Sequence, residues 1–245
     1  MKNLALYITA TLLVAFFSSC SEDSTTSPSN NNGTGLPLAV GNTWEYQTFD
    51  TDENGNTIGA VLDEYALTIV GKANIAGKEA FLITDNSDES LDSIYMYSDN
   101  SGLYSYDEPE ETGSIGIWIK IIDFKNTKWD IYKVDIDEVD EEEGTTTKGV
   151  TGMKGERIAS SKVTYKGKSY DVENYQNINY SELVITYLDE NDELVTETVS
   201  ESDTTQISLI PGLGIYSSTS LEVEFTNEGI EFTKQMDILV NHNLK

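Results

Sequence analysis

Alternation of apolar and polar residues is the feature of this chain that most limits its fold. In LEVEF, residues 221–225, three apolar side chains fall on one face of an extended strand and two glutamates on the other. After TNEG, the run IEFTKQMDILV, residues 230–240, repeats the pattern. Two period-two runs joined by a short Asn/Gly loop predict a β-hairpin.

The same pattern recurs along most of the chain. Hairpins are predicted at residues 93–106 around a turn at 99–102, and at residues 181–199 around a turn at 189–192. A third pair of strands is predicted at residues 65–83, with turns near Gly71 and Gly77. No segment has the periodicity of an amphipathic helix. The sequence therefore predicts an all-β fold, a curved antiparallel sheet or half-barrel of roughly a dozen strands.

Three pairs of segments resemble one another in the same order. They are residues 42–50 and 126–135, residues 75–83 and 165–173, and residues 93–104 and 184–195. Two related halves would explain the similarity, and so would chance, because antiparallel β sequences match easily.

The amino terminus predicts export. A short basic start is followed by an apolar stretch, residues 4–17, that is long enough for a secretory signal and short for a membrane span. Ser18, Ser19 and Cys20 follow, and the whole resembles a bacterial lipoprotein signal, with Phe17 where that family prefers Leu. The resemblance implies cleavage before Cys20 and acylation of Cys20. The alternative is an ordinary signal in which Cys20 is removed or left free.

The residues after Cys20 bear on location. Ser21-Glu22-Asp23 resembles the surface-export signal of Bacteroidota lipoproteins, which implies an outer-membrane lipoprotein at the cell surface, with a periplasm-facing domain as the alternative. Residues 21–35 contain no aliphatic or aromatic side chain and predict a disordered tether. The expected organisation is a signal peptide at 1–19, a lipidated cysteine and tether at 20–35, and a β-rich domain at 36–245.

The composition argues against nucleic acid and anionic headgroups as partners of the domain, and against disulfide bonds as a source of its stability. The formal net charge is −28, and loss of the signal with Lys2 brings it to −29. Such a chain does not bind nucleic acid by neutralising phosphates. It would also be repelled by anionic headgroups, so the lipid is expected to supply the membrane contact. With one cysteine, no disulfide framework can form.

Two short motifs resemble a broad group of bacterial lipoproteins of uncharacterised role. These are PLAVGNTWEY, residues 37–46, and LIPGLGIYSS, residues 209–218. In that group a second tryptophan usually follows a glycine, whereas Trp129 here follows Asn126-Thr127-Lys128. The resemblance implies a curved antiparallel sheet, of the half-barrel kind used by lipoprotein carriers, and no known activity. The physical interpretation is that both motifs build turns.

Residues for catalysis are scarce. His242 is the only histidine and lies near the C-terminus, where we expect a frayed end, and Arg157 is the only arginine. A frayed end is a poor place for the base of a catalytic triad, and one histidine with a lipidated cysteine cannot supply the usual nitrogen and sulfur ligands of zinc. Carboxylates are abundant, but no pair stands out by spacing. The protein is therefore predicted not to be an enzyme.

One loop has the ligand spacing of a calcium site. Asp50, Asp52 and Asn54 alternate, Gly55 follows and Asn56 ends the run, but the twelfth position holds Val61 instead of Glu. The alternative is a hairpin turn, for which Asn54-Gly55 is a strong signal. No cofactor is predicted apart from this calcium candidate.

Four tyrosines are candidates for binding. Tyr95, Tyr97, Tyr104 and Tyr106 lie on the two strands of one predicted hairpin. Facing solvent, they could stack on sugar rings or contact an envelope protein; the alternative is that they stabilise the sheet.

The sequence thus predicts a lipid-anchored, exported, non-catalytic binding or structural module of the cell envelope, attached to the membrane through its N-terminal lipid, with a glycan or an envelope protein as partner. Two alternatives stay open. One is a lipid or lipoprotein carrier with an apolar cavity, and the other is a carboxylate-dependent glycan hydrolase.

Overall fold

The computed structural model describes residues 36–52, 54–86, 93–107, 116–140, 144–188, 193–226 and 229–245. None of these residues belongs to a helix long and apolar enough to cross a membrane. They form twelve β-strands: β1 Thr43–Thr51, β2 Thr57–Ile75, β3 Lys78–Asp85, β4 Ser93–Asp99, β5 Gly102–Asp107, β6 Ile117–Asp123, β7 Lys128–Asp140, β8 Thr145–Tyr165, β9 Lys168–Leu188, β10 Leu194–Ile210, β11 Gly214–Thr226 and β12 Gly229–Asn243.

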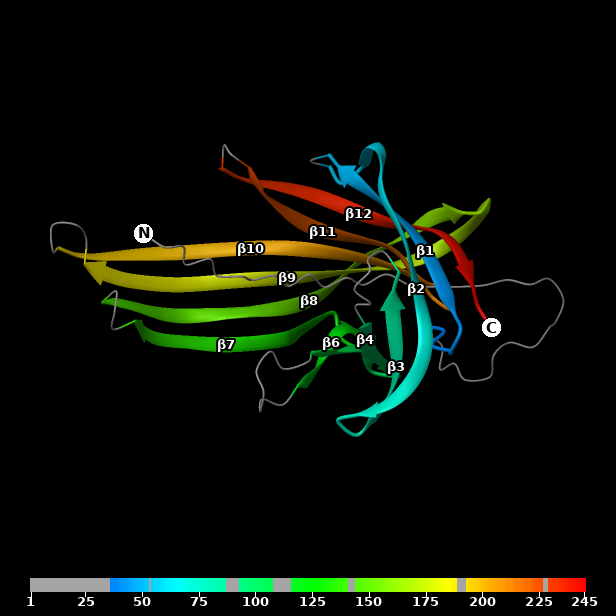
Figure 1. Cartoon of the computed structure of the whole chain (residues 1–245), viewed down its shortest axis with the longest axis horizontal. Helices are drawn as coiled ribbons and strands as arrows, with labels where there is room; N and C mark the ends of the chain where they lie inside the picture. Colours follow the sequence, from blue (N-terminus) through cyan, green and yellow to red (C-terminus); the bar gives the residue numbers. More distant parts are fainter. Residues whose placement is uncertain are drawn as a thin grey trace.

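All twelve strands belong to one antiparallel sheet. Its order is β6-β5-β4-β3-β2-β1-β12-β11-β10-β9-β8-β7, so each strand pairs with its neighbour in the chain except at one place. The first and last strands also pair, from Thr43 opposite Asn243 to Asp50 opposite Gln235. The sheet curls until its two edges, β6 and β7, approach each other (Figure 1). The predicted all-β fold of about a dozen strands is confirmed, as an antiparallel sheet nearly closed into a barrel.

Side chains and backbone groups, rather than a strand ladder, join β6 to β7. The Trp129 indole Nε1 donates a hydrogen bond to the Lys120 carbonyl across the gap, at 3.0 Å. Arg157, on β8, adds hydrogen bonds to the loop between β6 and β7: its guanidinium donates to the Phe124 carbonyl at 2.7 Å, and its backbone N–H donates to the Thr127 carbonyl at 2.8 Å. We call this region the seam.

Large apolar side chains fill the interior of the curled sheet. Alternation along each strand sends every second residue inward, as the burial of Trp44 and Tyr46 on β1 shows. The largest fully buried side chains are Trp44, Tyr46, Tyr175, Ile69, Ile83, Met96, Leu103, Ile121, Ile122 and Ile207. Each such side chain stabilises the fold by about 1.5–3 kcal/mol relative to exposure, so the core holds the fold without a disulfide.

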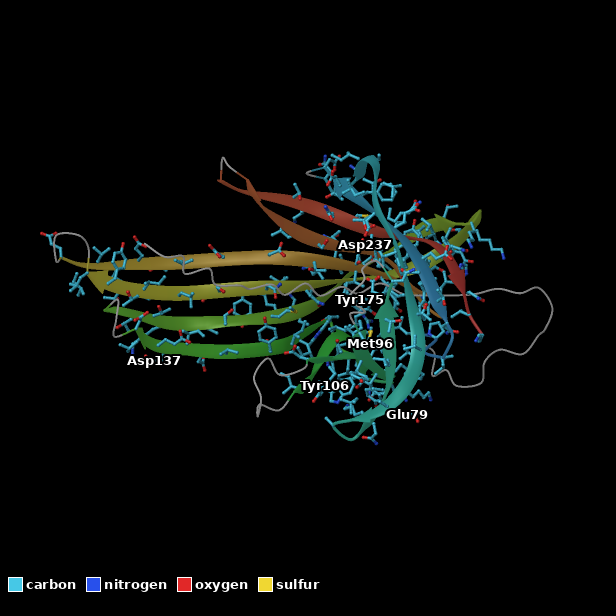
Figure 2. All side chains as sticks on the ribbon, in the orientation of Figure 1. Glu79, Met96, Tyr106, Asp137, Tyr175 and Asp237 are labelled. Atoms are coloured by element: carbon cyan, nitrogen blue, oxygen red, sulfur yellow. The ribbon has the colours of Figure 1, made fainter. Side chains whose placement is uncertain are left out.

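Four strands extend beyond the barrel as a blade (Figure 1). The blade begins at the row of paired residues Lys133, Gly152, Tyr180 and Ser202 and runs to the ends of the β7–β8 and β9–β10 hairpins. Its side chains are mostly half-buried or exposed, because no second layer of described residues covers this part of the sheet. Figure 2 shows Asp137 far out on the blade, whereas Tyr175 and Met96 lie in the barrel.

The Gly41-Asn42 motif joins the two ends of the domain. The Asn42 side-chain amide donates to the Pro37 carbonyl at 2.5 Å, and its oxygen accepts the Lys245 backbone N–H at 2.8 Å. The backbone carbonyl of Asn42 also accepts from Ile69 N–H at 2.9 Å. Gly41 has φ of 90°, a backbone conformation that suits glycine. This motif therefore has an architectural role, as its turn chemistry predicts.

The local hairpin predictions are confirmed at their described ends. Asp99 pairs with Gly102, Thr226 with Gly229, and Leu188 with Leu194, while residues 189–192 lie outside the described residues. The predicted turn near Gly71 is wrong. β2 runs on to Ile75, and a register shift between Ile69 and Gly71 takes the place of a turn.

Two of the three matched segment pairs occupy equivalent places in the barrel. The first pair includes β1 and β7, which are six strands apart, and the second covers the β2–β3 and β8–β9 turns. Both turns carry the same left-handed pair, Ala76-Gly77 with φ of 46° and 79° and Lys166-Gly167 with φ of 47° and 75°. The third pair falls on turns at opposite ends of the barrel. Two related halves therefore stay a prediction.

Candidate binding surface

Trp118 lies on the outside of the barrel beside three of the predicted tyrosines, Tyr97, Tyr104 and Tyr106. Tyr97 pairs with Tyr104 across β4 and β5, and Tyr106 pairs with Trp118 across β5 and β6. Met96, between Tyr95 and Tyr97, is fully buried in the interior, so the flanking tyrosines face outward. We call Tyr95, Tyr97, Tyr104, Tyr106 and Trp118 the outer aromatic patch.

The rings of the patch contact one another. The Tyr97 centroid lies 5.5 Å from that of Tyr104 and 6.1 Å from that of Trp118, and the Tyr106 centroid lies 5.2 Å from that of Trp118. The side chains of the whole patch are half-buried, so each ring keeps part of its surface in solvent. Trp118 was not among the predicted binding residues. Its place between Ile117 and Ile119 in a β-like run is the sequence signal for a side chain on the opposite face from those isoleucines.

A lysine from the β2–β3 end lies over the patch. Lys78 Nζ is 4.4 Å from the Tyr97 centroid and 4.7 Å from the Tyr104 centroid, within cation–π distance of both. The Trp118 indole Nε1 donates to the Ile75 carbonyl at 3.2 Å, which fixes the ring against the same hairpin. Lys120 Nζ lies 5.5 Å from the Tyr104 centroid, so two lysines approach the patch, each on a side chain with four rotatable bonds.

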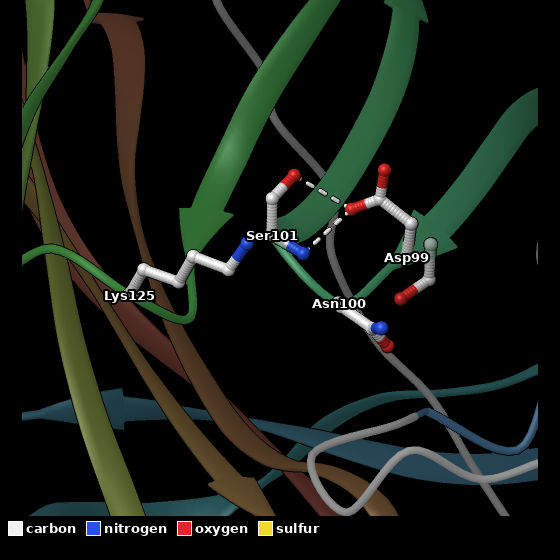
Figure 3. Close-up of a pocket in the computed structure, with 5 residues that line it drawn as sticks. Asp99, Asn100, Ser101 and Lys125 are labelled. Atoms are coloured by element: carbon white, nitrogen blue, oxygen red, sulfur yellow. Dashed lines mark hydrogen bonds between the residues drawn. The ribbon is translucent and has the colours of Figure 1, made fainter.

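A polar hollow of about 390 Å³ adjoins the patch (Figure 3). The hollow is lined by Ser98, Asp99, Asn100, Ser101 and Lys125. Asp99 Oδ1 accepts hydrogen bonds from the Ser101 backbone N–H at 2.7 Å and from its hydroxyl at 2.6 Å. Tyr97 Oη donates to Asp99 Oδ2 at 2.9 Å, and the hydroxyls of Ser101 and Tyr104 lie 2.6 Å apart. The hollow and the patch therefore form one continuous surface.

The charge state of this surface is set by those contacts. Burial raises the pKa of Asp99, but hydrogen bonds from Ser101 and Tyr97 outweigh it and hold the pKa below its usual value. Burial, and next the hydrogen bond to Asp99, raise the pKa of Tyr97. At neutral pH the hollow therefore presents a carboxylate, an amide, hydroxyls and the Lys125 ammonium beside aromatic rings. This combination suits a ligand with apolar faces and a polar edge.

The predicted calcium loop is built as a turn around Asp52. Asp52 Oδ1 accepts backbone N–H groups from Asn54 at 2.9 Å and Asn56 at 2.8 Å, and Oδ2 accepts the Asn56 amide at 3.0 Å. These hydrogen bonds, the one from the Asn56 side chain first, lower the pKa of Asp52. Asp50 lies on β1, opposite Gln235, and Glu53 lies outside the described residues. Among the described residues, no three or more His, Cys, Asp or Glu side chains could hold a metal ion together. Calcium binding stays a prediction.

His242 sits in an ordered strand. β12 pairs with β1 as far as Asn243, so the expectation of a frayed end is wrong. His242 Nδ1 lies 2.5 Å from the Tyr165 hydroxyl, and burial, followed by the charge of Lys166, lowers the pKa of His242 to about 4. The ring is therefore neutral at pH 7 and contacts a phenol, which is a packing role.

Two carboxylates are buried within the described part of the chain, and both have structural partners. Asp123 accepts backbone N–H groups from Lys125 at 2.8 Å and Asn126 at 2.9 Å, and pairs with the Lys120 ammonium at 3.0 Å. Asp237 accepts the Thr48 hydroxyl at 2.8 Å and the Ser218 hydroxyl at 3.2 Å. Cys20, the expected lipidation site, lies outside the described residues.

Comparisons with known proteins give two distant structural likenesses and no family. A scan against models of protein families found no match, and neither did a comparison with curated proteins. Among solved structures, a protein assigned as a lipoprotein in Parabacteroides distasonis is similar with 10% sequence identity and a TM-score of 0.43, over 86% of this chain and 99% of that one. A protein assigned as exported, with a YmcC-like fold, from Bacteroides fragilis is similar with 8% identity and a TM-score of 0.38, over the same shares. At these TM-scores neither likeness carries an argument about activity.

Proposed function

We propose that this protein is a lipid-anchored, exported binding protein without catalytic activity, and that the outer aromatic patch with its polar hollow binds a saccharide of the cell envelope. Cys20, at the end of a lipoprotein-like signal, carries the anchor. The proposed ligand is a sugar because its C–H faces stack on aromatic rings while its hydroxyls need carboxylate, amide and ammonium partners.

The observation that carries the proposal is the direct contact between rings and hollow. The Tyr97 and Tyr104 hydroxyls bond to Asp99 and Ser101, so a sugar stacked on either ring would have the polar groups of the hollow at its edge. Lys78 lies over the same two rings. Its long side chain can swing aside or pair with an acidic group on the sugar.

The two alternatives have less support. A hydrolase needs two carboxyls facing a bound sugar, whereas the buried carboxyls of Asp123 and Asp237 hold a turn and a strand pair. A carrier needs an apolar cavity, whereas the described interior is filled by large side chains such as Trp44 and Tyr175. A binding protein requires neither feature.

The anchor is tested by Cys20→Ala in the full chain expressed in its host. The variant is expected in the soluble fraction, and mass spectrometry of the unaltered protein is expected to show an acylated peptide that begins at Cys20. Membrane retention of Cys20→Ala at the level of the unaltered protein would remove this part of the proposal.

The patch is tested by binding of oligosaccharides from bacterial envelope polysaccharides, measured by calorimetry. We expect Trp118→Ala and Tyr97→Ala each to weaken binding by about two- to tenfold, because stacking on one ring contributes about 0.5–1.5 kcal/mol beyond area burial. Tyr180→Ala is the matched control, since Tyr180 is a half-buried outer tyrosine with Lys154 Nζ 5.2 Å from its centroid, but on the blade. Binding that survives the double variant Tyr97→Ala/Trp118→Ala, or the absence of binding to every saccharide tried, would refute the assignment.

A further inference from the structure

The charges of this acidic protein are segregated along its length. Carboxylates dominate the blade, where Asp135 pairs with Lys133 and Asp137 with Lys148, and further acidic residues follow towards the hairpin ends. The opposite end, where the tight turns lie, carries lysines beside carboxylates: Lys128 pairs with Glu156 and Lys162 with Asp171, whereas Lys125, Lys166, Lys168 and Lys245 have no ion-pair partner among the described residues. The net charge of −28 therefore does not describe the surface at this end.

Three of these lysines lie at this end of the molecule, near the β8–β9 turn and the end of β12 (Figure 1). Lys166 and Lys168 flank the β8–β9 turn, and Lys166 Nζ donates to Asn241 Oδ1 on β12 at 2.6 Å. Four residues later, Lys245 lies at the C-terminal end of the chain. All three lysines are exposed, and none has an ion-pair partner in the described part of the chain. We call Lys166, Lys168 and Lys245 the basic corner.

The chain enters the domain at this same corner. Leu36, the first described residue, is buried in the core, and Pro37 is tied to Lys245 through the Asn42 side chain. The β8–β9 turn and the C-terminus lie on the same side of the molecule, opposite the tip of the blade (Figure 1). The segment that carries the expected anchor, residues 20–35, thus joins the described domain beside the basic corner.

We propose that the basic corner docks on a membrane surface bearing anionic lipid headgroups. Phosphate groups are the chemistry that unpaired lysine ammonium groups at a membrane surface recognise. The attachment point of the residues before Leu36 places this corner nearest the bilayer, so this step rests on the proposed lipid anchor. The acidic blade then points away from the membrane.

The acidic end does not cancel the attraction. β9 has 21 residues, from Lys168 at the basic corner to Leu188 at the far end of the blade. At about 3.3 Å per residue these ends are about 66 Å apart, and charges are screened over about 8 Å at physiological salt. Nearby, Glu45 opposes the corner with one exposed carboxylate, which accepts from Asn241 at 2.9 Å, and Asp171 is paired with Lys162 at 2.7 Å. Among the described residues, the corner therefore carries three lysines without ion-pair partners against the one carboxylate of Glu45.

The test uses the mature chain with Cys20→Ser, so that no lipid contributes, and sedimentation with vesicles. Vesicles of 30% phosphatidylglycerol in phosphatidylcholine are compared with pure phosphatidylcholine at low and high salt. We expect binding to the anionic vesicles only, lost at high salt. Each lysine near the surface contributes about fivefold to partitioning, so Lys166→Gln/Lys168→Gln/Lys245→Gln should weaken binding by at least about tenfold.

The control removes the same charge elsewhere. Lys133→Gln/Lys148→Gln/Lys154→Gln takes three lysines from β7 and β8, all remote from the corner, and should leave vesicle binding unchanged. Thermal melting confirms that both triple variants are folded. Equal loss in the two triple variants, or equal binding of the parent chain to neutral and anionic vesicles, overturns the docking proposal. Because no lipid is attached, these outcomes are independent of the Cys20→Ala result and of saccharide binding.

Discussion

The seam between β6 and β7 offers a sharp test of how the barrel is held closed. Arg157→Met removes the guanidinium that donates to the Phe124 carbonyl at 2.7 Å and lies 5.5 Å from the Tyr175 ring centroid. The further contact to the Asp123 carbonyl is long, at 3.4 Å, and adds little. The backbone bond from Arg157 to Thr127 is unaffected by the substitution.

The magnitude follows from these contacts. A hydrogen bond from a charged donor contributes about 1.5–3 kcal/mol, and a cation–π contact at a partly exposed site about 0.5–1 kcal/mol. Methionine regains about 1 kcal/mol by covering Tyr175. The expected loss in the free energy of unfolding is therefore about 1–3 kcal/mol, which lowers Tm by about 2–12 °C in a domain of this size.

Urea and thermal unfolding followed by circular dichroism measure this loss. Lys154→Met is the control, because Lys154 is exposed on the same strand and its loss should change stability by at most about 0.5 kcal/mol. Arg157→Lys keeps the charge without the planar fork and should fall between the two. If Arg157→Met is as stable as Lys154→Met, the guanidinium does not close the seam and the side-chain account of the barrel is wrong.

Two further predictions concern pH and metal. The folded pKa of His242, about 4, lies below its ordinary value of 6.5, so the stability linked to this ring is complete above pH 6.5 and is lost as pH falls towards 4. Allowing for solvent screening of a half-buried ring, we expect the free energy of unfolding in urea to be about 1 kcal/mol lower at pH 4 than at pH 7. The His242→Asn variant should show a flatter dependence of stability on pH. Both Asp52 oxygens accept N–H donors, so we expect the same Tm with calcium and with a chelator, and a calcium-dependent rise in Tm would show that the loop rearranges into a metal site.

Local pattern was enough to predict most of the strands. The hairpin around Asp99 to Gly102 could be read from the sequence because both strands and their turn lie within fourteen residues, 93–106. The turn predicted near Gly71 was wrong because a glycine in a strand pattern marks either a turn or an irregularity of the strand. Only the pairing of β2 with β3 distinguishes the two. Local signals therefore predict strand content better than where each strand ends.

The closure of the sheet could not be predicted in this way. β1 pairs with β12, with Thr43 opposite Asn243, and the sequence of either strand alone does not predict which strand is its partner. The seam likewise depends on Trp129 and Arg157, which alternation treats as ordinary strand residues. Part of the candidate site could be predicted from the sequence, because the four tyrosines share one hairpin. Trp118 and Lys78 could not be added in this way, because they lie on a third and a fourth strand.

The charge distribution shows most clearly why fold is needed to interpret composition. Net charge is a sum over the chain, whereas a membrane or a ligand meets only the charges within about one screening length. An antiparallel meander gathers alternate turns at one end, and here the turn at Lys166 and the chain end at Lys245 lie on the same side of the molecule (Figure 1). A chain with the same composition but with lysines and carboxylates exchanged between turn and blade would have the same pI and the opposite polarity. The basic corner is thus a property of topology, and exchanging Lys148 with Glu45 or Lys166 with Glu182 would change docking without changing net charge.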